Sequence, residues 1–592
     1  MISRQRILTI PVLLLLACIC TACAGADTPT PAAVPVVTAT VRVTDAPAQA
    51  TYLPTASLPA ATTTPAATTP AATAPAVPPT ATRLATATTT ATATLAPAGG
   101  TVRYGLVAPA LNLDPVYVET VADRQIARLV WESLLQIDPV DGRLRAGLAQ
   151  EWAISDDGYT LRFTLVPDAL WHDGTPVSAW DVVATLEYLI MPGSRSPWQI
   201  DLASVESVTA YGDLDVEILL SEPMCASLYD IGLVPILPAH QLRDLGAPEP
   251  GREFVGSGPF RQGEPADNGN VRLFQNSAYR ERVVLDELIL VPYASNAALH
   301  EAWAAGQVDV THFPAGQGAP ADGGVSFSLP GVDYFLLIFN LRRGALMDVE
   351  AREALTLALD RESIAGQVSP SGATLLQASL LSDHWALSEA DLPAPAYDPM
   401  AAGAMLSEAG WADEDGDGWR NKWDTLLSLD VLTNGENPLR MSTAALVAQS
   451  FRRIGVESEL HVVEWGIFLD LLFRHDFDVA VISWPFPLDP DQSVFWRSSE
   501  TEAGRGFNFG QWENEDADAL LDEAATYPGC DVQGRAALYG EFARLMGGEL
   551  PIVPLFVPHG QLLVRETVFG VNPGAFAGPL CNAHTWASTS EE

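Results

Sequence analysis

A sharp change of composition near residue 100 divides this 592-residue chain into two parts that must fold differently. Residues 24–100 are mainly Thr, Pro and Ala, and their only charged residues are two arginines and two aspartates. Such a segment has too little bulky apolar surface to form a core, so we expect an extended, polyproline-biased tether. A folded domain therefore has to lie within residues 101–592.

The first 23 residues have the pattern of a bacterial lipoprotein signal peptide. Two arginines precede an apolar run over residues 7–19, which is too short to cross a bilayer but has the length of a signal-peptide core. The run ends in two motifs that each resemble a lipobox, one at Cys18 and one at Cys23. We favour lipidation of Cys23, because small and polar residues follow it; Cys18 and an ordinary signal peptide are the alternatives. We therefore expect an extracytoplasmic protein that a lipid anchors to the cell membrane.

The composition of the chain is that of a globular, acidic protein. Hydrophobic residues make up 48% of it, 15 residues are Trp, and 32 basic residues against 73 acidic ones give a net charge of −41. Such a charge repels polyphosphate, which excludes nucleic-acid binding as the function. It also favours a neutral or cationic ligand.

The hydrophobic patterns beyond residue 100 predict a mixed α/β fold. Residues 102–107 and 160–166 have the composition or the two-residue alternation of strands. Ser178, followed three residues later by an aspartate, has the form of a helix N-cap. Residues 351–359 and 444–454 carry apolar stripes at helical spacing.

Short motifs occur in a characteristic order along residues 101–580. They are GLAQEW (147–152), SDDGYT (155–160), FTL (163–165), WHDGTPVSAWDV (171–182), VGSGPF (255–260), Asn340, REAL (352–355), YDP (397–399), AGW (409–411), DGDG (415–418), IGV (454–456) and FD (477–478). Their order and spacing resemble the extracytoplasmic solute-binding proteins, family 5, of dipeptide- and oligopeptide-type ABC importers. The Asp-Gly and Gly-Ser-Gly-Pro motifs themselves are typical of backbone turns.

The resemblance implies a two-lobed α/β fold of the type II periplasmic-binding-protein kind, with a discontinuous first lobe and a hinge that closes over one ligand. Residues 101–335 would form the first lobe with an inserted subdomain, 336–550 the second lobe, and 551–592 a return to the first lobe and a tail. Connections between the lobes are expected near residues 334–340 and 551–558, which are apolar and strand-like.

The same resemblance implies that the protein captures a small solute and delivers it to ABC permease and ATPase subunits. In peptide-binding relatives an aspartate shortly after a tryptophan receives the amino terminus of the peptide. Here Trp484 is followed by Phe486 and Pro487 where that aspartate would fall, so Asp489 or Asp491 would have to replace it. We therefore place a peptide ahead of an oligosaccharide without excluding the second.

An oligosaccharide would need aromatic rings on which its sugars stack. Trp465, Trp484 and Trp496 are the candidates, and packing in the core is the alternative for each. An enzyme or a transporter-independent sensor using the same cleft are the competing functions. Asp489 and Asp491, two residues apart, would be the only credible acid and base of such an enzyme, and we expect no catalytic residues.

One acidic loop could hold calcium. Asp413, Asp415 and Asp417 stand at positions 1, 3 and 5 of an EF-hand-like register, and Asp424 stands at position 12. A bound ion would be structural, and a solvated hairpin of Asp-Gly turns is the alternative. We expect no other cofactor.

Three cysteines follow the signal peptide, namely Cys225, Cys530 and Cys581. An exported protein can join two of them, and spacing alone does not decide which. We take Cys530 with Cys581 as the expected pair, which leaves one free thiol.

Overall fold

The computed structural model describes residues 99–589 apart from 109–110, 112, 119, 243–253, 265–267, 388–389, 391 and 393–395. The predicted signal peptide, both lipobox cysteines and nearly all of the predicted tether lie outside the described residues. Within the described part of the chain, no helix combines the length and the apolar character that crossing a membrane requires.

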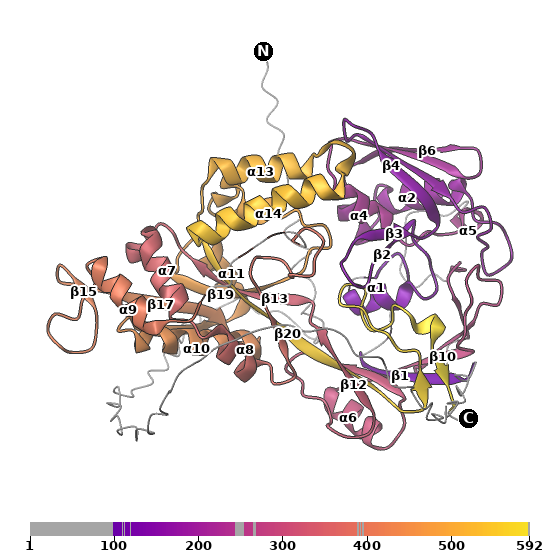
Figure 1. Cartoon of the computed structure of the whole chain (residues 1–592). Helices are drawn as coiled ribbons and strands as arrows, with labels where there is room; N and C mark the ends of the chain where they lie inside the picture. Colours follow the sequence, from indigo (N-terminus) through magenta and orange to yellow (C-terminus); the bar gives the residue numbers. More distant parts are fainter. Residues whose placement is uncertain are drawn as a thin grey trace, which may run out of the picture. The chain divides into compact units, whose positions relative to one another are not determined.

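A twelve-stranded sheet runs through the fold (Figure 1). Its main path is β18 (Glu457–Val463), β17 (Ser428–Asn434), β19 (Val479–Pro485), β13 (Asp333–Phe339), β20 (Ile552–Val564), β11 (Val310–Phe313), β1 (Thr101–Val107), β10 (Glu287–Tyr293), β9 (Val271–Gln275) and β8 (Phe260–Gln262). Two further strands, β12 (Val325–Pro330) and β14 (Ala373–Leu375), pair with β20. The predicted strands at 102–107 and 160–166 are confirmed.

The long strand β20 belongs to both halves of this sheet. Its first part pairs with β13, where Ile338 lies opposite Ile552, and its last part pairs with β11, where Val310 lies opposite Val564. The apolar cores divide at the same place. One core takes residues from 102 to 329 and from 562 to 586, and two others take residues from 334 to 557. This division is that of a two-lobed fold with a discontinuous first lobe.

The first lobe also contains a smaller sheet with helices around it. The sheet order is β4 (Ala149–Ile154), β5 (Thr160–Leu165), β7 (Asp215–Leu220) and β6 (Val205–Tyr211), and β2 (Leu135–Ile137) pairs with β3 (Leu144–Ala146). Its helices are α1 (Val121–Ala127), α2 (Ala179–Ile190), α3 (Trp198–Asp201), α4 (Ser227–Gly232), α5 (Ala239–Leu242) and α6 (Asn296–Ala304). The predicted N-cap is confirmed, because Ser178 and Asp181 form a capping box at the start of α2.

The second lobe carries most of the longer helices. They are α7 (Val349–Leu357), α8 (Arg361–Val368), α9 (Pro399–Glu408), α10 (Pro438–Arg453), α11 (Trp465–Phe473), α12 (Ser493–Trp496), α13 (Glu515–Ala525) and α14 (Val532–Glu549). The stripes predicted on α7 and α10 are buried, and Gly455 follows α10 with a φ of 82°, as a helix-ending glycine does. Helices α13 and α14 lie side by side (Figure 1).

The expected pairing of Cys530 with Cys581 is wrong. Cys530 lies in the turn between α13 and α14 and forms a disulfide with Cys225, 305 residues earlier, with a Cα–Cα distance of 5.5 Å. Cys581 is free, and its Sγ lies 3.6 Å from the carbonyl oxygen of Asn572. Packing of the lobes, which the spacing of cysteines does not encode, selects the partner.

Candidate ligand cleft

A cavity of about 1270 Å³ opens where the chain passes between the lobes. Residues 329–333, at the junction of β12 and β13, line it together with Pro558 and Gly560 of β20. Both lobes contribute the rest of its wall. The cavity therefore lies at the point about which the lobes would bend.

The wall from the second lobe consists of loops that follow three parallel strands. β17 runs parallel to β18 and to β19, so their carboxyl ends meet at one edge of the sheet. Residues 434, 436–440, 464–465, 485–489 and 491 extend from these ends into the lining. Such an edge is where open α/β sheets bind ligands.

The wall from the first lobe is helical. Arg124 and Arg128 come from α1 and its C-cap, Asp201 ends α3, and Tyr229 and Asp230 lie on α4. Arg124 pairs with Asp201 at 3.5 Å. The lining thus carries charges of both signs beside a largely apolar surface.

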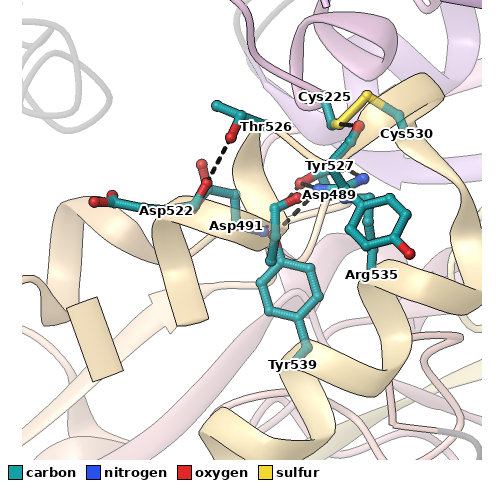
Figure 2. Close-up of a disulfide and its surroundings, with 10 residues drawn as sticks. Cys225, Asp489, Asp491, Asp522, Thr526, Tyr527, Cys530, Arg535 and Tyr539 are labelled. Atoms are coloured by element: carbon teal, nitrogen blue, oxygen red, sulfur yellow. Dashed lines mark hydrogen bonds and ion pairs between the residues drawn. A yellow bond between two sulfur atoms is a disulfide. The ribbon is translucent and has the colours of Figure 1, made fainter. Parts of the chain in front are cut away.

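Asp489 lines the cavity but already has a basic partner. Both Nη atoms of Arg535 on α14 donate to its carboxylate oxygens, at 2.7 and 2.8 Å, and both side chains are buried. Nη2 of Arg535 also donates to the hydroxyl of Tyr539 at 3.1 Å. Figure 2 shows this pair beside Asp491. Asp489 is therefore neutralised within the protein.

Asp230 and Asp491 have no such compensation. Burial, followed by the charges of Asp201, Asp489 and Asp491, raises the pKa of Asp230 well above its ordinary value. Burial also raises the pKa of Asp491, although the backbone N–H and hydroxyl of Ser493 donate to it at 2.9 and 2.5 Å. Among the described residues, no basic side chain forms an ion pair with either carboxylate.

Two arginines in the lining likewise have unused donors. Burial, and then the charge of Arg124, lowers the pKa of Arg128 to about 10, and no carboxylate of the described residues pairs with Arg128. The guanidinium of Arg440, in the first turn of α10, lies 5.1 Å above the ring of Trp465, and its Nε and Nη1 have no hydrogen-bond partner in the described structure. The cleft can therefore receive an anionic group as well as a cationic one.

The predicted ligand residues separate into two sets. Trp465, Asp489 and Asp491 line the cavity. Trp484 is buried against the rings of Phe495 and Phe509, at centroid distances of 5.0 and 6.0 Å, and is outside the lining.

Trp496 is buried as well, and its indole N–H donates to Gln492 at 2.9 Å. It is also outside the lining. For Trp484 and Trp496 the structure therefore shows core packing.

Sequence reasoning missed Asp230, Arg128 and Arg440. A usable signal existed only for Arg440, because the polar residues that follow a buried strand and open the next helix gather at a sheet edge. The two first-lobe residues lie on short helices, and only the packing of the lobes brings them to the cleft.

The acidic loop brings part of its predicted calcium set together. Ligand oxygens of Asp413, Asp415 and Asp417 lie within 4.8 Å of one another, and Asp424 is not in that group. Asp413 accepts backbone N–H groups of Gly416 and Gly418 at 2.8 and 3.1 Å. Calcium binding here stays a prediction. Asp430, Glu459 and His461 form a second group of potential ligands, which sequence reasoning also missed.

A family model for the bacterial extracellular solute-binding proteins, family 5, matches residues 143–505. The chain belongs to this family. Its fold and the position of its cleft between two lobes are those expected of a family 5 solute-binding protein.

Named proteins and solved structures are similar to this chain over most of its length. The chain is 27% identical over 490 residues to the oligopeptide-binding protein AppA of Bacillus subtilis, covering 80% of this chain and 89% of that protein. It is 27% identical over 497 residues to the probable deoxycholate-binding periplasmic protein YgiS of Escherichia coli, covering 78% and 88%. Among solved structures, NikZ of Campylobacter jejuni in complex with Ni(L-His) has 25% identity and a TM-score of 0.62, covering 82% and 99%.

Proposed function

We propose that this family 5 solute-binding protein captures a short peptide, or a small molecule with the same two end charges, outside the cytoplasm and delivers it to an ABC permease and its ATPase. One observation supports a ligand with charges of both signs. Among the described residues of the cleft, Asp230 and Asp491 form no ion pair with a basic side chain, and Arg128 and Arg440 form none with a carboxylate. A zwitterionic ligand would satisfy both.

The ammonium group would bind at Asp491 and Asp230. Of the two aspartates expected from the sequence, Asp489 is the weaker candidate because Arg535 already occupies both of its oxygens. An ammonium group bound at Asp491 would offset the repulsion between the buried carboxylates of Asp491 and Asp230. Asp491, a few residues further along the loop, would thereby take the role of the aspartate that is missing shortly after Trp484.

The carboxylate of the ligand would bind near Arg128 or Arg440. Charge-assisted hydrogen bonds to a guanidinium are strong and directional, and Arg440 has two donor atoms unused. It also lies in the first turn of α10, where the helix dipole favours an anion.

Two observations weigh against the alternative functions. An oligosaccharide would leave the unpaired charges desolvated without compensation, and only Trp465 of the three candidate tryptophans lines the cavity. An enzyme with Asp489 and Asp491 as acid and base would need Asp489 free for proton transfer, whereas both of its oxygens accept hydrogen bonds from Arg535. The relatives named for an oligopeptide and for deoxycholate show equal identity, so the ligand argument rests on the cleft.

Calorimetry with one peptide in three forms tests this function. We expect the unmodified peptide to bind one to one, and its N-acetylated and C-amidated forms to bind more weakly. Asp491→Asn should weaken binding of the unmodified peptide by about 2–5 kcal/mol, the scale for truncating one partner of a buried charge pair. It should barely change the binding of the acetylated form. Asp470→Asn, on the exposed face of α11, is the matched control. Equal binding of all three forms would contradict the proposal.

We propose in addition that lipidation at Cys23 anchors the protein to the extracytoplasmic face of the membrane. The apolar run followed by a lipobox-like motif supports this. Labelling of cells with a fatty acid should mark the protein, and Cys23→Ala should abolish the label. Label that persists in that variant and disappears only in Cys18→Ala would assign the anchor to Cys18.

A further inference from the structure

The Cys225–Cys530 disulfide joins the two lobes away from the strands that connect them. Cys225 lies between β7 and α4 in the first lobe, whereas Cys530 lies in the turn between α13 and α14 in the second. Figure 2 shows the bond running from the first-lobe ribbon to this turn. Neither cysteine belongs to β12, β13 or β20, so the bond is a third connection between the lobes.

Hydrogen bonds between the lobes accompany the disulfide. The backbone N–H of Cys225 donates to the carbonyl of Ala525 at 2.8 Å. The backbone N–H of Trp385 donates to the carbonyl of Asp141 at 3.1 Å, and its indole N–H donates to the hydroxyl of Tyr229 at 3.0 Å. We call these three hydrogen bonds and the disulfide the clasp.

The clasp is continuous with the wall of the cleft. Ala226, Tyr229 and Asp230 lie within five residues after Cys225, and all three line the cavity. On the other side, Arg535 lies one helical turn beyond the disulfide on α14 and holds Asp489, which lines the cavity too. A change of spacing at the clasp therefore moves both charged walls.

We propose that the disulfide keeps the lobes in contact along this edge and so limits how far the cleft opens. The strands β13 and β20 hold the lobes at the hinge, and a hinge alone would let the opposite edges separate freely. With the Cα atoms of Cys225 and Cys530 tied at 5.5 Å, the lobes can rotate only about a line through the hinge and the clasp. The limit acts whatever ligand the cleft binds.

Without the covalent bond, the clasp would consist of hydrogen bonds alone. A disulfide keeps the two edges at high effective concentration, so broken hydrogen bonds re-form at once. Cys225 is 1% exposed and Cys530 is partly exposed, so a reductant can reach the bond only from the side of the α13–α14 turn. An extracytoplasmic location also favours its persistence.

Hydrogen exchange read at single amides of the full chain tests the clasp. The variant is Cys225→Ser with Cys530→Ser, and the control is Cys581→Ser, which leaves the disulfide intact. We expect the backbone amides of residues 225 and 385 to exchange on the order of tenfold faster or more in the double variant. The amide of Phe339, which donates to Pro551 at 3.1 Å beside the hinge strands, should keep its protection.

Two outcomes would overturn the proposal. Unchanged exchange at residues 225 and 385 would mean that the edge stays closed without the disulfide. Equal loss of protection at Phe339 would mean that the disulfide stabilises the whole fold and does not restrain opening. If the double variant does not fold, the folded Cys581→Ser protein, measured before and after reduction of its disulfide with a phosphine, supplies the same comparison.

Discussion

Arg535 and Asp489 face each other with two parallel hydrogen bonds of 2.7 and 2.8 Å, although 46 residues separate them in the chain. Arg535 is 3% exposed and Asp489 is 7% exposed. A buried pair of this kind costs desolvation energy to form, but losing one partner leaves an uncompensated charge. The pair therefore fixes the loop after β19 against α14.

Arg535→Met should destabilise the protein by about 3–5 kcal/mol, because it leaves the Asp489 carboxylate buried and unpaired. Urea unfolding at neutral pH measures this. The double variant Arg535→Met with Asp489→Leu should recover much of the loss, since it removes both charges. A double variant as unstable as the single one would show that the ion pair is not the source of the effect.

Asp230→Asn should stabilise the ligand-free protein at neutral pH by on the order of 1 kcal/mol or more. The pKa of Asp230 is raised above its ordinary 3.8, so folding favours the protonated acid. That contribution is complete below pH 3.8 and is lost as pH rises through the raised pKa. The asparagine mimics the protonated form at every pH. In thermal unfolding from pH 3.5 to 7, the stability advantage of the asparagine variant over the original protein should grow as the pH rises. A difference that stays constant with pH would refute the assignment.

His384→Gln should make the protein less sensitive to acid. Burial lowers the pKa of His384 from 6.5 to about 4, and its ring bonds the carbonyl of Leu488 at 3.1 Å and the N–H of Ala386 at 3.2 Å. The unfolded chain takes up the proton first, so the stability from the neutral ring is lost as pH falls from 6.5 to about 4.

Between pH 7 and pH 4 the native protein should lose about 3 kcal/mol more than the glutamine variant. Denaturant unfolding at both pH values measures the difference. An equal loss in both proteins would mean that His384 does not titrate as its burial implies.

Gly256→Ala should prevent stable folding. A Cβ atom at Gly256 would lie 2.0 Å from the carbonyl oxygen of Val130, which is backbone and cannot yield. We expect a loss of more than about 4 kcal/mol. Gly366→Ala, inside α8 with no atom within 4 Å of the new Cβ, is the matched control and should be neutral or stabilising by about 1 kcal/mol. A soluble Gly256→Ala protein with native stability would contradict the steric argument.

Local features of the fold could be predicted because their causes lie within a few residues. The capping box of Ser178 with Asp181 spans one helical turn, and the strand at 160–165 alternates by itself. The order of motifs gave the family and the two-lobed architecture. These signals concern neighbours in the chain, so packing does not alter them.

The charged cleft and the disulfide could not be predicted in the same way. Trp484 lies at the end of the buried strand β19 and Trp465 opens α11 after β18, yet the first packs among phenylalanines and the second lines the cavity. Asp489 looked free because its partner is on a helix much later in the chain, and Cys225 meets Cys530 across 305 residues. Such pairings depend on how the lobes pack, which no local pattern records.

The route of the chain also determines when the first lobe can fold. Its core contains Leu562, Val564 and Trp586, near the very end of the sequence, and β20 supplies the strand next to β11. The first lobe therefore cannot be completed before residues 562–586 are present. The second lobe, whose cores lie within residues 334–557, is completed earlier. A chain that stopped before β20 would lack the strand next to β11 and part of the first-lobe core, and would therefore lose the lobe that it begins with.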